Sequence, residues 1–502
     1  MKKNYTLALD QNIEEIEESY KYLFLAISCI AWLDKETIES SSNIENINLA
    51  VDTIYKSNKA LNKEKIQSEI LNNIRLIKKI IDSQPNAIIF DCDGTLVQTE
   101  AINKLTFKEI LKPNKDKLTP LEIQEIYQNQ VSYAIENIED DKEIKEILEE
   151  VFKKEIESKK QEYEHSPYKV ILGILIDEEN EIIEEKKLLF VSLLLSSLIK
   201  GLTFNAAFNT ILTLRLPGQF NDIQEFRKSF RFHNKGIKES VGVESTLGTR
   251  EFLEENSTPY IVASNSPNFV ILENTQQLNI PQEKILSSHD LEKKRGKPYP
   301  DVFLLALKKL NSESSKTIII EDSKPGVLAG LSAGVCSTFA KQISTKLNSF
   351  ISTIATSEKQ KVKMINTIER KITETITNEK YMDTIIETLE RIIFGPIYLL
   401  GENCIETGVK KVHDNLLKSE ILEELTDQIN QIIIDSNSET EKKLLTKEIL
   451  KMYLNFITEN TLNNLPQIII FNNGENQALC DHQSFLSISD MKNLNILLNQ
   501  DK

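Results

Sequence analysis

The chain has 502 residues, a length that soluble proteins commonly divide among about three domains. Its hydrophobic fraction of 40% and charged fraction of 27% are ordinary for a globular protein. The net charge of −16 argues against a general affinity for nucleic acid or anionic membranes, because both repel an acidic surface.

Cysteine usage and apolar runs indicate the compartment. The five cysteines are scattered and form no CxxC pair, which predicts a reducing, cytoplasmic environment without a disulfide framework. Apolar runs occur at 22–33 and 188–199. Each is shorter than the roughly 20 residues that span a bilayer, so we expect buried helices and no membrane span.

Residues 1–84 have helical periodicity. A heptad seam runs through 13–30, and a second apolar face comprises Ile66, Ile70, Ile74, Ile77 and Ile81. We expect a helical N-terminal extension here, without catalytic chemistry of its own.

From residue 85 to 342 short strands alternate with helices. The predicted strands are 87–90, 260–263, 284–288 and 317–320, and 302–310 is a predicted helix. Such alternation predicts an α/β fold with a parallel sheet, in which ligands bind beyond the carboxyl ends of the strands.

Two helical regions complete the predicted organisation. Residues 101–247, with a highly charged stretch at 138–164, interrupt the series and indicate an inserted domain, so the core comprises 85–100 and 248–342. Residues 343–502 are predicted as a mainly helical C-terminal domain with one strand within 466–474. Cys480 and His482 are too few to predict a metal site.

Two carboxylates follow the first predicted strand, in the stretch IIFDCDGTL. Asp91 and Asp93 stand at i and i+2, so in extended backbone they face the same way. Two like charges about 4 Å apart repel by about 4 kcal/mol at an effective dielectric of 20. The pair therefore calls for a shared proton or a cation.

The other strand ends supply complementary groups. Ser264 follows the predicted strand 260–263, and Glu321 and Asp322 follow the predicted strand 317–320. Lys297 lies in the loop RGKPYPD between these two strands. One chemistry uses all of them: a carboxylate attacks phosphorus, a divalent cation bridges carboxylates and phosphate, and a second carboxylate transfers protons. The lysine and hydroxyl would then hold phosphate oxygens.

The four segments DCDGTLVQTE, ASNSP, RGKPYPD and IIIEDSKPGVLAGLSAG resemble, in order, the four motifs of the haloacid dehalogenase superfamily. Successive spacings from Asp91 to Ser264, Lys297 and Asp322 are 173, 33 and 25 residues. The resemblance implies a Rossmann-like core with a helical cap, and the first spacing, which is longer than usual, indicates that this cap is enlarged. The resemblance covers about 85–342.

This resemblance implies residue roles. Asp91 would be the nucleophile and Asp93 the general acid/base, with Ser264 and Lys297 holding the phosphoryl group. Mg²⁺ would be bound by Asp91, Asp322 and the backbone carbonyl of Asp93. Ser264, Asn265 and Lys297, with Arg231 from the cap, are the predicted substrate-binding residues.

The implied activity is a magnesium-dependent phosphatase acting on a small phosphate monoester through an aspartyl-phosphate. Residues 200–255 loosely resemble the cap of sugar-phosphate phosphatases, and Arg227, Arg231, His233 and Lys235 offer cations there. Asp93 argues against a dehalogenase, whereas a phosphomutase of the β-phosphoglucomutase type shares every motif. A protein-interaction or regulatory protein, or a protein phosphatase recruiting partners through the helical extensions, also stays open.

Overall fold

The structure, a computed structural model, describes residues 48, 51–52, 63–111, 223–355, 357–394, 404–418, 420–436, 465–471 and 484–498. The seam predicted at 13–30, both apolar runs, the stretch at 138–164, and Cys480 with His482 lie outside these residues. Within the described part of the chain, every helix is too short or too polar to cross a lipid bilayer.

A six-stranded parallel sheet forms the centre of the fold, in the order β5-β4-β1-β6-β7-β8. Its strands are β1 (Ala87–Phe90), β4 (Tyr260–Ser264), β5 (Ile285–Ser287), β6 (Thr317–Glu321), β7 (Gln467–Phe471) and β8 (Leu486–Ile488). The first four confirm the predicted strands to within one residue at each end, and the predicted α/β class is confirmed. Because the strands are parallel, their carboxyl ends share one edge of the sheet.

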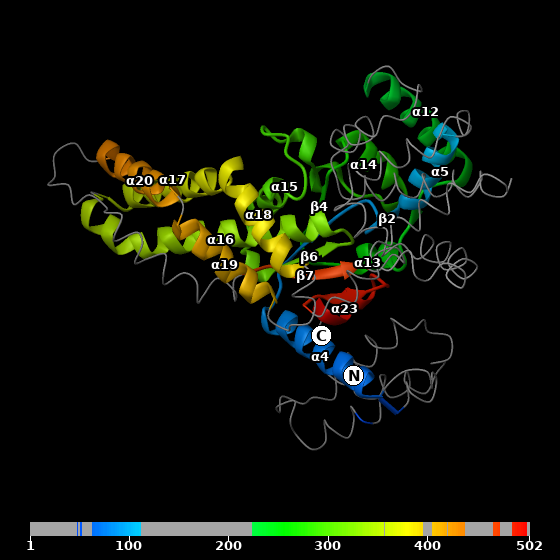
Figure 1. The fold of residues 1–502 in the computed structure, drawn as a ribbon, viewed down its shortest axis with the longest axis horizontal. Helices are drawn as coiled ribbons and strands as arrows, with labels where there is room; N and C mark the ends of the chain where they lie inside the picture. The colour runs from blue at the N-terminus through cyan, green and yellow to red at the C-terminus, as the bar shows by residue number, and fades with distance from the viewer. Residues whose placement is uncertain are drawn as a thin grey trace, which may run out of the picture.

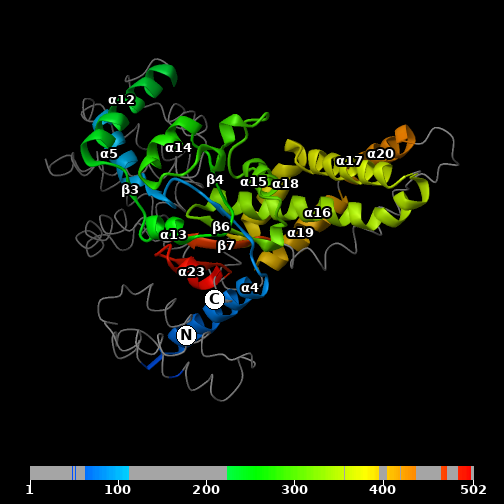
Figure 2. The same cartoon turned by 180° about the vertical axis from the view of Figure 1, so that it is seen from behind.

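The two faces of the sheet carry separate apolar clusters, because successive side chains of a strand point to opposite faces. Ile89 and Ile319 pack with α15 (Asp301–Leu310) and α16 (Lys324–Ile354). Their neighbours Ile88 and Ile318 belong to the cluster that includes α4 (Lys63–Asp82) and α23 (Asn493–Leu498). Figures 1 and 2 show these helices on opposite sides of the sheet.

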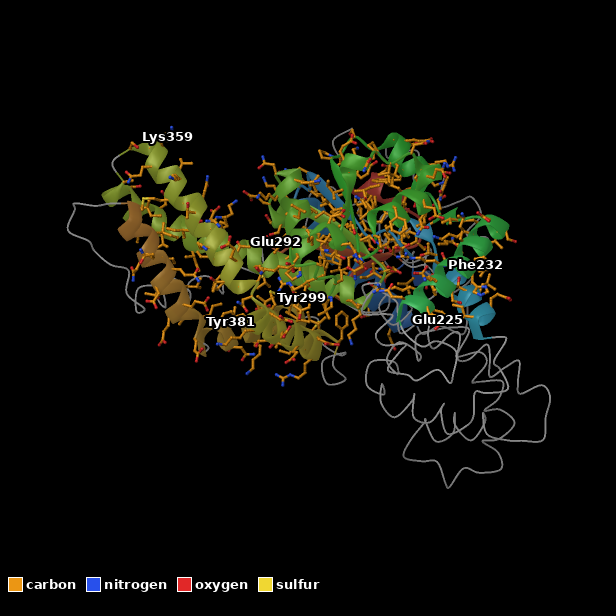
Figure 3. All side chains as sticks on the ribbon, turned by 90° about the horizontal axis from the view of Figure 1, so that it is seen from above. Glu225, Phe232, Glu292, Tyr299, Lys359 and Tyr381 are labelled. Carbon is orange, nitrogen blue, oxygen red and sulfur yellow. The ribbon has the colours of Figure 1, made fainter. Side chains whose placement is uncertain are left out.

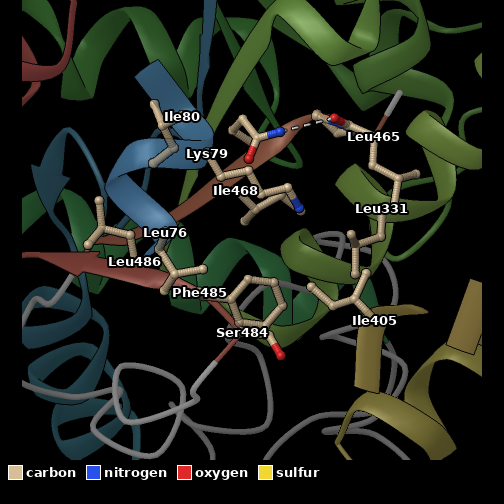
Figure 4. A pocket seen from close by; sticks show the side chains of 12 residues that line it. Leu76, Lys79, Ile80, Leu331, Ile405, Leu465, Ile468, Ser484, Phe485 and Leu486 are labelled. Carbon is tan, nitrogen blue, oxygen red and sulfur yellow. Dashed lines mark hydrogen bonds between the residues drawn. The ribbon is translucent and has the colours of Figure 1, made fainter. Parts of the chain in front are cut away.

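Helix α4 confirms the apolar face predicted for the end of the N-terminal extension. Its buried residues include Ile70, Ile74 and Ile77, and they pack into the sheet's second cluster. A cavity of only about 30 Å³ remains where α4 meets β7, β8 and two further helices, lined in part by Leu76 and Phe485 (Figure 4). The described part of the extension is therefore packed onto the core.

In the region predicted as the cap, the structure describes α5 (Glu100–Leu111) and α12 (Ile223–Val241). Phe107 of α5 lies 5.3 Å, ring centre to ring centre, from Phe230 of α12. The chain enters and leaves the cap through the antiparallel pair β2 (Val97–Gln98) and β3 (Glu244–Ser245). Of two short helices, α13 (Thr249–Glu255) precedes β4 in the chain and α14 (Asn268–Asn274) follows it.

The five helices that the structure describes between β6 and β7 form what we call the helical arm (Figure 1). They are α16, α17 (Glu358–Ile376), α18 (Glu379–Ile393), α19 (Cys404–Lys418) and α20 (Ile421–Ser436). Helix α16 packs against α17 and α18, α17 against α20, and α18 against α19. Short 3₁₀ helices at Gln276–Leu278, Gln282–Lys284, Ser288–Asp290 and Ser314–Lys316 complete the described elements of the core.

The boundary predicted at residue 342 differs from the structure in two respects. It falls inside α16, which is continuous over 31 residues. Strands β7 and β8, from the segment predicted as a separate C-terminal domain, pair in parallel with β6 and with each other. The strand pattern at 466–474 is confirmed, but such a pattern does not show which sheet a strand joins. The helical arm is thus an insertion within the sheet's own connectivity.

Candidate functional site

Asp91 stands directly after β1, at the carboxyl edge of the sheet, and is only 7% exposed. Its N–H donates to the carbonyl of Ile320 (2.9 Å), which fixes it beside β6. The chain then turns at Gly94, whose φ of +84° favours glycine. A Cβ at Gly94 would lie 2.1 Å from Asp322 Oδ2, so glycine permits this turn to approach the end of β6.

Lys297 joins β1 to β6 electrostatically. Its ammonium contacts Asp91 Oδ1 and Glu321 Oε1, and its side chain is 1% exposed. Burial by itself lowers the pKa of Lys297, but the two carboxylates outweigh burial and raise that pKa above its usual value. The lysine is therefore held as a cation. Its backbone N–H donates to Asn265 Oδ1 (2.9 Å), which ties its loop to the end of β4.

The Asp91 carboxyl is in an unfavourable place for a lone negative charge. Burial raises its pKa well above the ordinary value, and the carboxylates of Glu321 and Asp322 add to the rise, while Lys297 opposes it. A further cation at this position would favour the ionised form that a nucleophile needs.

Glu321 has a positioning role that the sequence did not assign. Its Oε2 accepts bonds from the N–H groups of Asp322 and Ser323 (3.0 Å each) and from Ser323 Oγ (2.9 Å). A Cβ at position 326 would lie 1.9 Å from Glu321 carboxylate atoms, so Gly326 leaves room for them. The motif letters E-D-S-x-x-G contain all these partners, and they are the signal that could have identified this role.

The acidic groups fit a hard divalent cation. Asp91, Glu321 and Asp322 each offer a carboxylate oxygen, and these atoms lie within 4.8 Å of one another. Three carboxylates face one ammonium, and oxygen donors are what Mg²⁺ prefers. Because both oxygens of Glu321 accept bonds from protein donors, Asp91 and Asp322 are the side chains best placed to hold a metal.

The charge of Asp93 is balanced by hydrogen-bond donors of the protein and not by the cation that we predicted it would share with Asp91. Its Oδ1 accepts bonds from Thr99 Oγ1 (3.1 Å) and Asn274 Nδ2 (3.0 Å), and its Oδ2 accepts one from Ser266 Oγ (2.7 Å). Ser264 Oγ lies 3.5 Å from the same Oδ2. Neutral donors therefore surround the Asp93 carboxylate, and its predicted metal-binding atom, the backbone carbonyl, stays a prediction.

The residues predicted at the carboxyl end of β4 lie beside the Asp93 carboxylate. Ser264 is 2% exposed and accepts a bond from the Ser266 N–H (3.0 Å). Thr95 Oγ1 lies 3.4 Å from Asp322 Oδ1. The structure thus brings together six predicted residues from three strand ends and from the loop after β5: Asp91, Asp93, Ser264, Asn265, Lys297 and Asp322.

Arg231 is placed apart from that group. It is exposed on α12, and its guanidinium carbon lies 5.9 Å from the ring centre of Phe269, at the start of α14. Nearby on the same helix, Arg227 is close enough to lower the pKa of His289, which burial already lowers. The cap helix α12 therefore presents arginines toward the loops after β4 and β5.

A model of the haloacid dehalogenase-like hydrolase family matches residues 88–184 and 180–340, together slightly more than half of the chain. A phosphorylated carbohydrates phosphatase of Thermotoga maritima is 30% identical over 120 residues, which are 23% of this chain and 54% of that protein. A bifunctional riboflavin kinase/FMN phosphatase of Arabidopsis thaliana is 51% identical over 43 residues, 9% of this chain and 11% of that protein. This chain thus spans about half of the first relative and a small part of the second.

Among solved structures, a putative beta-phosphoglucomutase from Thermotoga maritima shares 19% identity and covers 50% of this chain and 82% of its own. The TM-score is 0.28.

Proposed function

Because the chain belongs to the haloacid dehalogenase-like hydrolase family, we propose that it is a magnesium-dependent phosphatase acting on a small phosphate monoester. The observation that carries this proposal is the buried arrangement of Asp91, Lys297, Glu321 and Asp322 at one edge of the sheet. It provides a nucleophile, a fixed cation and a place for a divalent metal beside one another.

In the first step, a carboxylate oxygen of Asp91 attacks the phosphorus of the substrate. An O–P bond forms on Asp91, and the bond between phosphorus and the ester oxygen breaks. Asp93 gives a proton to the departing oxygen, which leaves as an alcohol. The donors around the Asp93 carboxyl group fix its position in the turn that follows β1.

In the second step, water attacks the phosphorus of the aspartyl-phosphate. Asp93, now a carboxylate, takes the proton of that water, and the O–P bond to Asp91 breaks. Inorganic phosphate is released, and both aspartates return to their starting states. One residue thus acts as acid and then as base.

Charge on the phosphoryl oxygens is the main electrostatic difficulty of both steps. Lys297 would bind one of these oxygens from its fixed place between Asp91 and Glu321, and Ser264 and Asn265 would donate to others. A bound Mg²⁺, held by Asp91 and Asp322, would supply further positive charge.

The proposed substrate class is a sugar phosphate. The name of the Thermotoga maritima relative supports this class, as do the cap arginines, Arg231 among them, because cations suit a polar or anionic leaving group. The proposal that protein partners dock on the helical extensions stays a prediction.

The test is a phosphate-release screen across sugar phosphates and a generic aryl phosphate, with and without Mg²⁺. We expect release that requires Mg²⁺ and is lost in Asp91→Asn. Release that is indifferent to Mg²⁺ would contradict the proposed metal role. Isomerised sugar phosphate without free phosphate would replace the phosphatase by a phosphomutase.

A further inference from the structure

Helix α18 of the helical arm lies beyond the region that the family model matches, which ends at residue 340. It nevertheless contacts both segments that carry site residues of the third and fourth motifs. One contact reaches the loop of Lys297, and the other reaches the first residue of α16, two positions after Asp322.

The first contact is a hydrogen bond from Tyr299. Its Oη donates to Asp383 Oδ1 of α18 at 2.6 Å. Burial, and after it this hydrogen bond, raises the pKa of Tyr299 above its usual value. Figure 3 labels Tyr299 on the side of the core where Tyr381 of α18 also lies. Tyr299 is two residues from Lys297, so its anchoring limits the movement of the lysine loop.

That loop is also closed on itself. Arg295 binds Asp301 through one guanidinium nitrogen, at 2.7 and 2.9 Å from the two carboxylate oxygens. The Arg295 guanidinium carbon also lies 4.7 Å from the Tyr299 ring centre. The loop can therefore act as a unit, and a displacement of Tyr299 would be passed on to Lys297.

The second contact is an ion pair. Lys324 Nζ lies 3.2 Å from Glu390 Oε1 and 5.3 Å from the ring centre of Phe394, just past the end of α18. Asp383 and Glu390 are seven residues apart, which places them two turns apart on one face of the helix. A single helical face thus reaches both catalytic segments.

An apolar core lies behind these polar contacts. The buried residues Met382 and Ile385 of α18 belong to one cluster with Val302 and Phe303 of α15. The Phe303 ring centre is 4.9 Å from Lys297 Nζ. Packing is therefore continuous from α18 to the buried lysine.

We propose that α18 is a brace for the active site, in which Asp383 and Glu390 are positioning residues that act through Tyr299 and Lys324. Asp383 sets the place of Lys297 relative to Asp91, and Glu390 sets the start of α16 behind Asp322. This inference deepens the proposed phosphatase function and depends on it for its catalytic consequence. Misplacement of a catalytic group by about 1 Å can cost up to about a hundredfold in rate. The contacts of α18 with Tyr299 and Lys324 can therefore affect the rate although they do not touch the substrate.

The test compares Asp383→Ala and Tyr299→Phe with Asp383→Asn, which keeps an acceptor oxygen for the tyrosine. With a generic aryl phosphate and Mg²⁺, we expect kcat to fall about tenfold in the first two variants, with KM changed less than twofold. Asp383→Asn should recover most of the rate, and Tyr299→Phe/Asp383→Ala should be no slower than either single variant. Glu387→Ala, at an exposed position of the same helix, is the matched control and should equal wild type.

Amide hydrogen exchange at Lys297 provides a readout that does not need activity, because its N–H donates to Asn265. We expect faster exchange in Asp383→Ala than in Glu387→Ala. Unchanged exchange, or a loss of kcat that Glu387→Ala shares, would overturn the brace. If wild type releases no phosphate, the phosphatase proposal fails by itself, and exchange alone decides whether α18 braces the loop.

Discussion

Charged side chains are buried at the carboxyl edge of the sheet, whereas those on the surface of the helical arm are exposed to solvent. At the sheet edge, Asp91, Lys297, Glu321 and Asp322 are each at most 7% exposed. In the arm, a pair such as Lys410 and Glu406 keeps 57% and 40% of its side-chain surface exposed. Burying charge costs free energy unless partners compensate it, so the edge is where chemistry is expected and the arm's surface is where it is not.

The largest difference between the sheet edge and the arm is expected when the proposed nucleophile, Asp91, is replaced. Asp91→Asn keeps the shape of the side chain but removes the charged attacking oxygen. We expect phosphate release to fall by about a thousandfold or more. The assay is the initial rate of phosphate release at saturating substrate and Mg²⁺.

Asp414→Asn is the matched control, because Asp414 is exposed on α19 of the arm. Its rate should equal that of wild type. An Asp91→Asn variant that is folded and retains more than a tenth of the wild-type rate would contradict the role of Asp91.

Removing the buried ammonium of Lys297 should reduce the stability of the protein more than any other change proposed here. Lys297→Met leaves two buried carboxylates without their partner, and we expect the free energy of unfolding to fall by about 3–5 kcal/mol. Adding Glu321→Gln should restore part of that stability but none of the activity. Urea unfolding measures both variants.

The surface pair provides the contrast. Lys410→Met breaks an exposed i,i+4 pair and should cost less than about 0.5 kcal/mol. Equal losses for Lys297→Met and Lys410→Met would mean that the two regions do not differ as the structure indicates.

Metal binding should stabilise the edge of the sheet without any substrate. Mg²⁺ at about a hundred times its Kd should raise the free energy of unfolding by about 2.7 kcal/mol, because it binds the folded carboxylates. Unfolding curves with Mg²⁺ and with a chelator measure the difference. Asp322→Asn should reduce it, and an identical Mg²⁺ effect in this variant would place the metal elsewhere.

Among the changes to buried residues, the smallest effect is expected inside the arm. Ile372 of α17 is completely buried, and Ile372→Val should cost about 0.5–1.5 kcal/mol of unfolding free energy. Because Ile372 takes no part in the polar contacts that join α18 to Tyr299 and Lys324, kcat should be unchanged. A drop in kcat under conditions where the variant is folded would show that the arm's interior is coupled to the site.

The sequence predicted most of the site because its residues follow strand ends. The apolar runs before Asp91, Ser264 and Asp322 predict buried parallel strands, and parallel strands bring their carboxyl ends to one edge. Lys297 followed from its place in a proline-rich loop between two such strands.

Other features depend on contacts between distant residues, which local patterns do not specify. Asn274 holds Asp93 across 181 positions of the chain, and nothing near either residue indicates the other. The strand at 467–471 is recognisable from the sequence, but its pairing with β6 is not, because more than a hundred residues of chain separate the two strands. A continuous apolar run such as IIIF, the last four residues of β7, is typical of a central parallel strand, and that composition is the hint the sequence offers.

The most direct measurement is mass spectrometry of the protein quenched in acid during turnover. The account predicts the added mass of one phosphoryl group on the peptide that contains Asp91, absent in Asp91→Asn. A phosphoryl group on a different residue, or steady turnover with no phosphorylated peptide under conditions that preserve acyl-phosphates, would contradict Asp91 as the nucleophile.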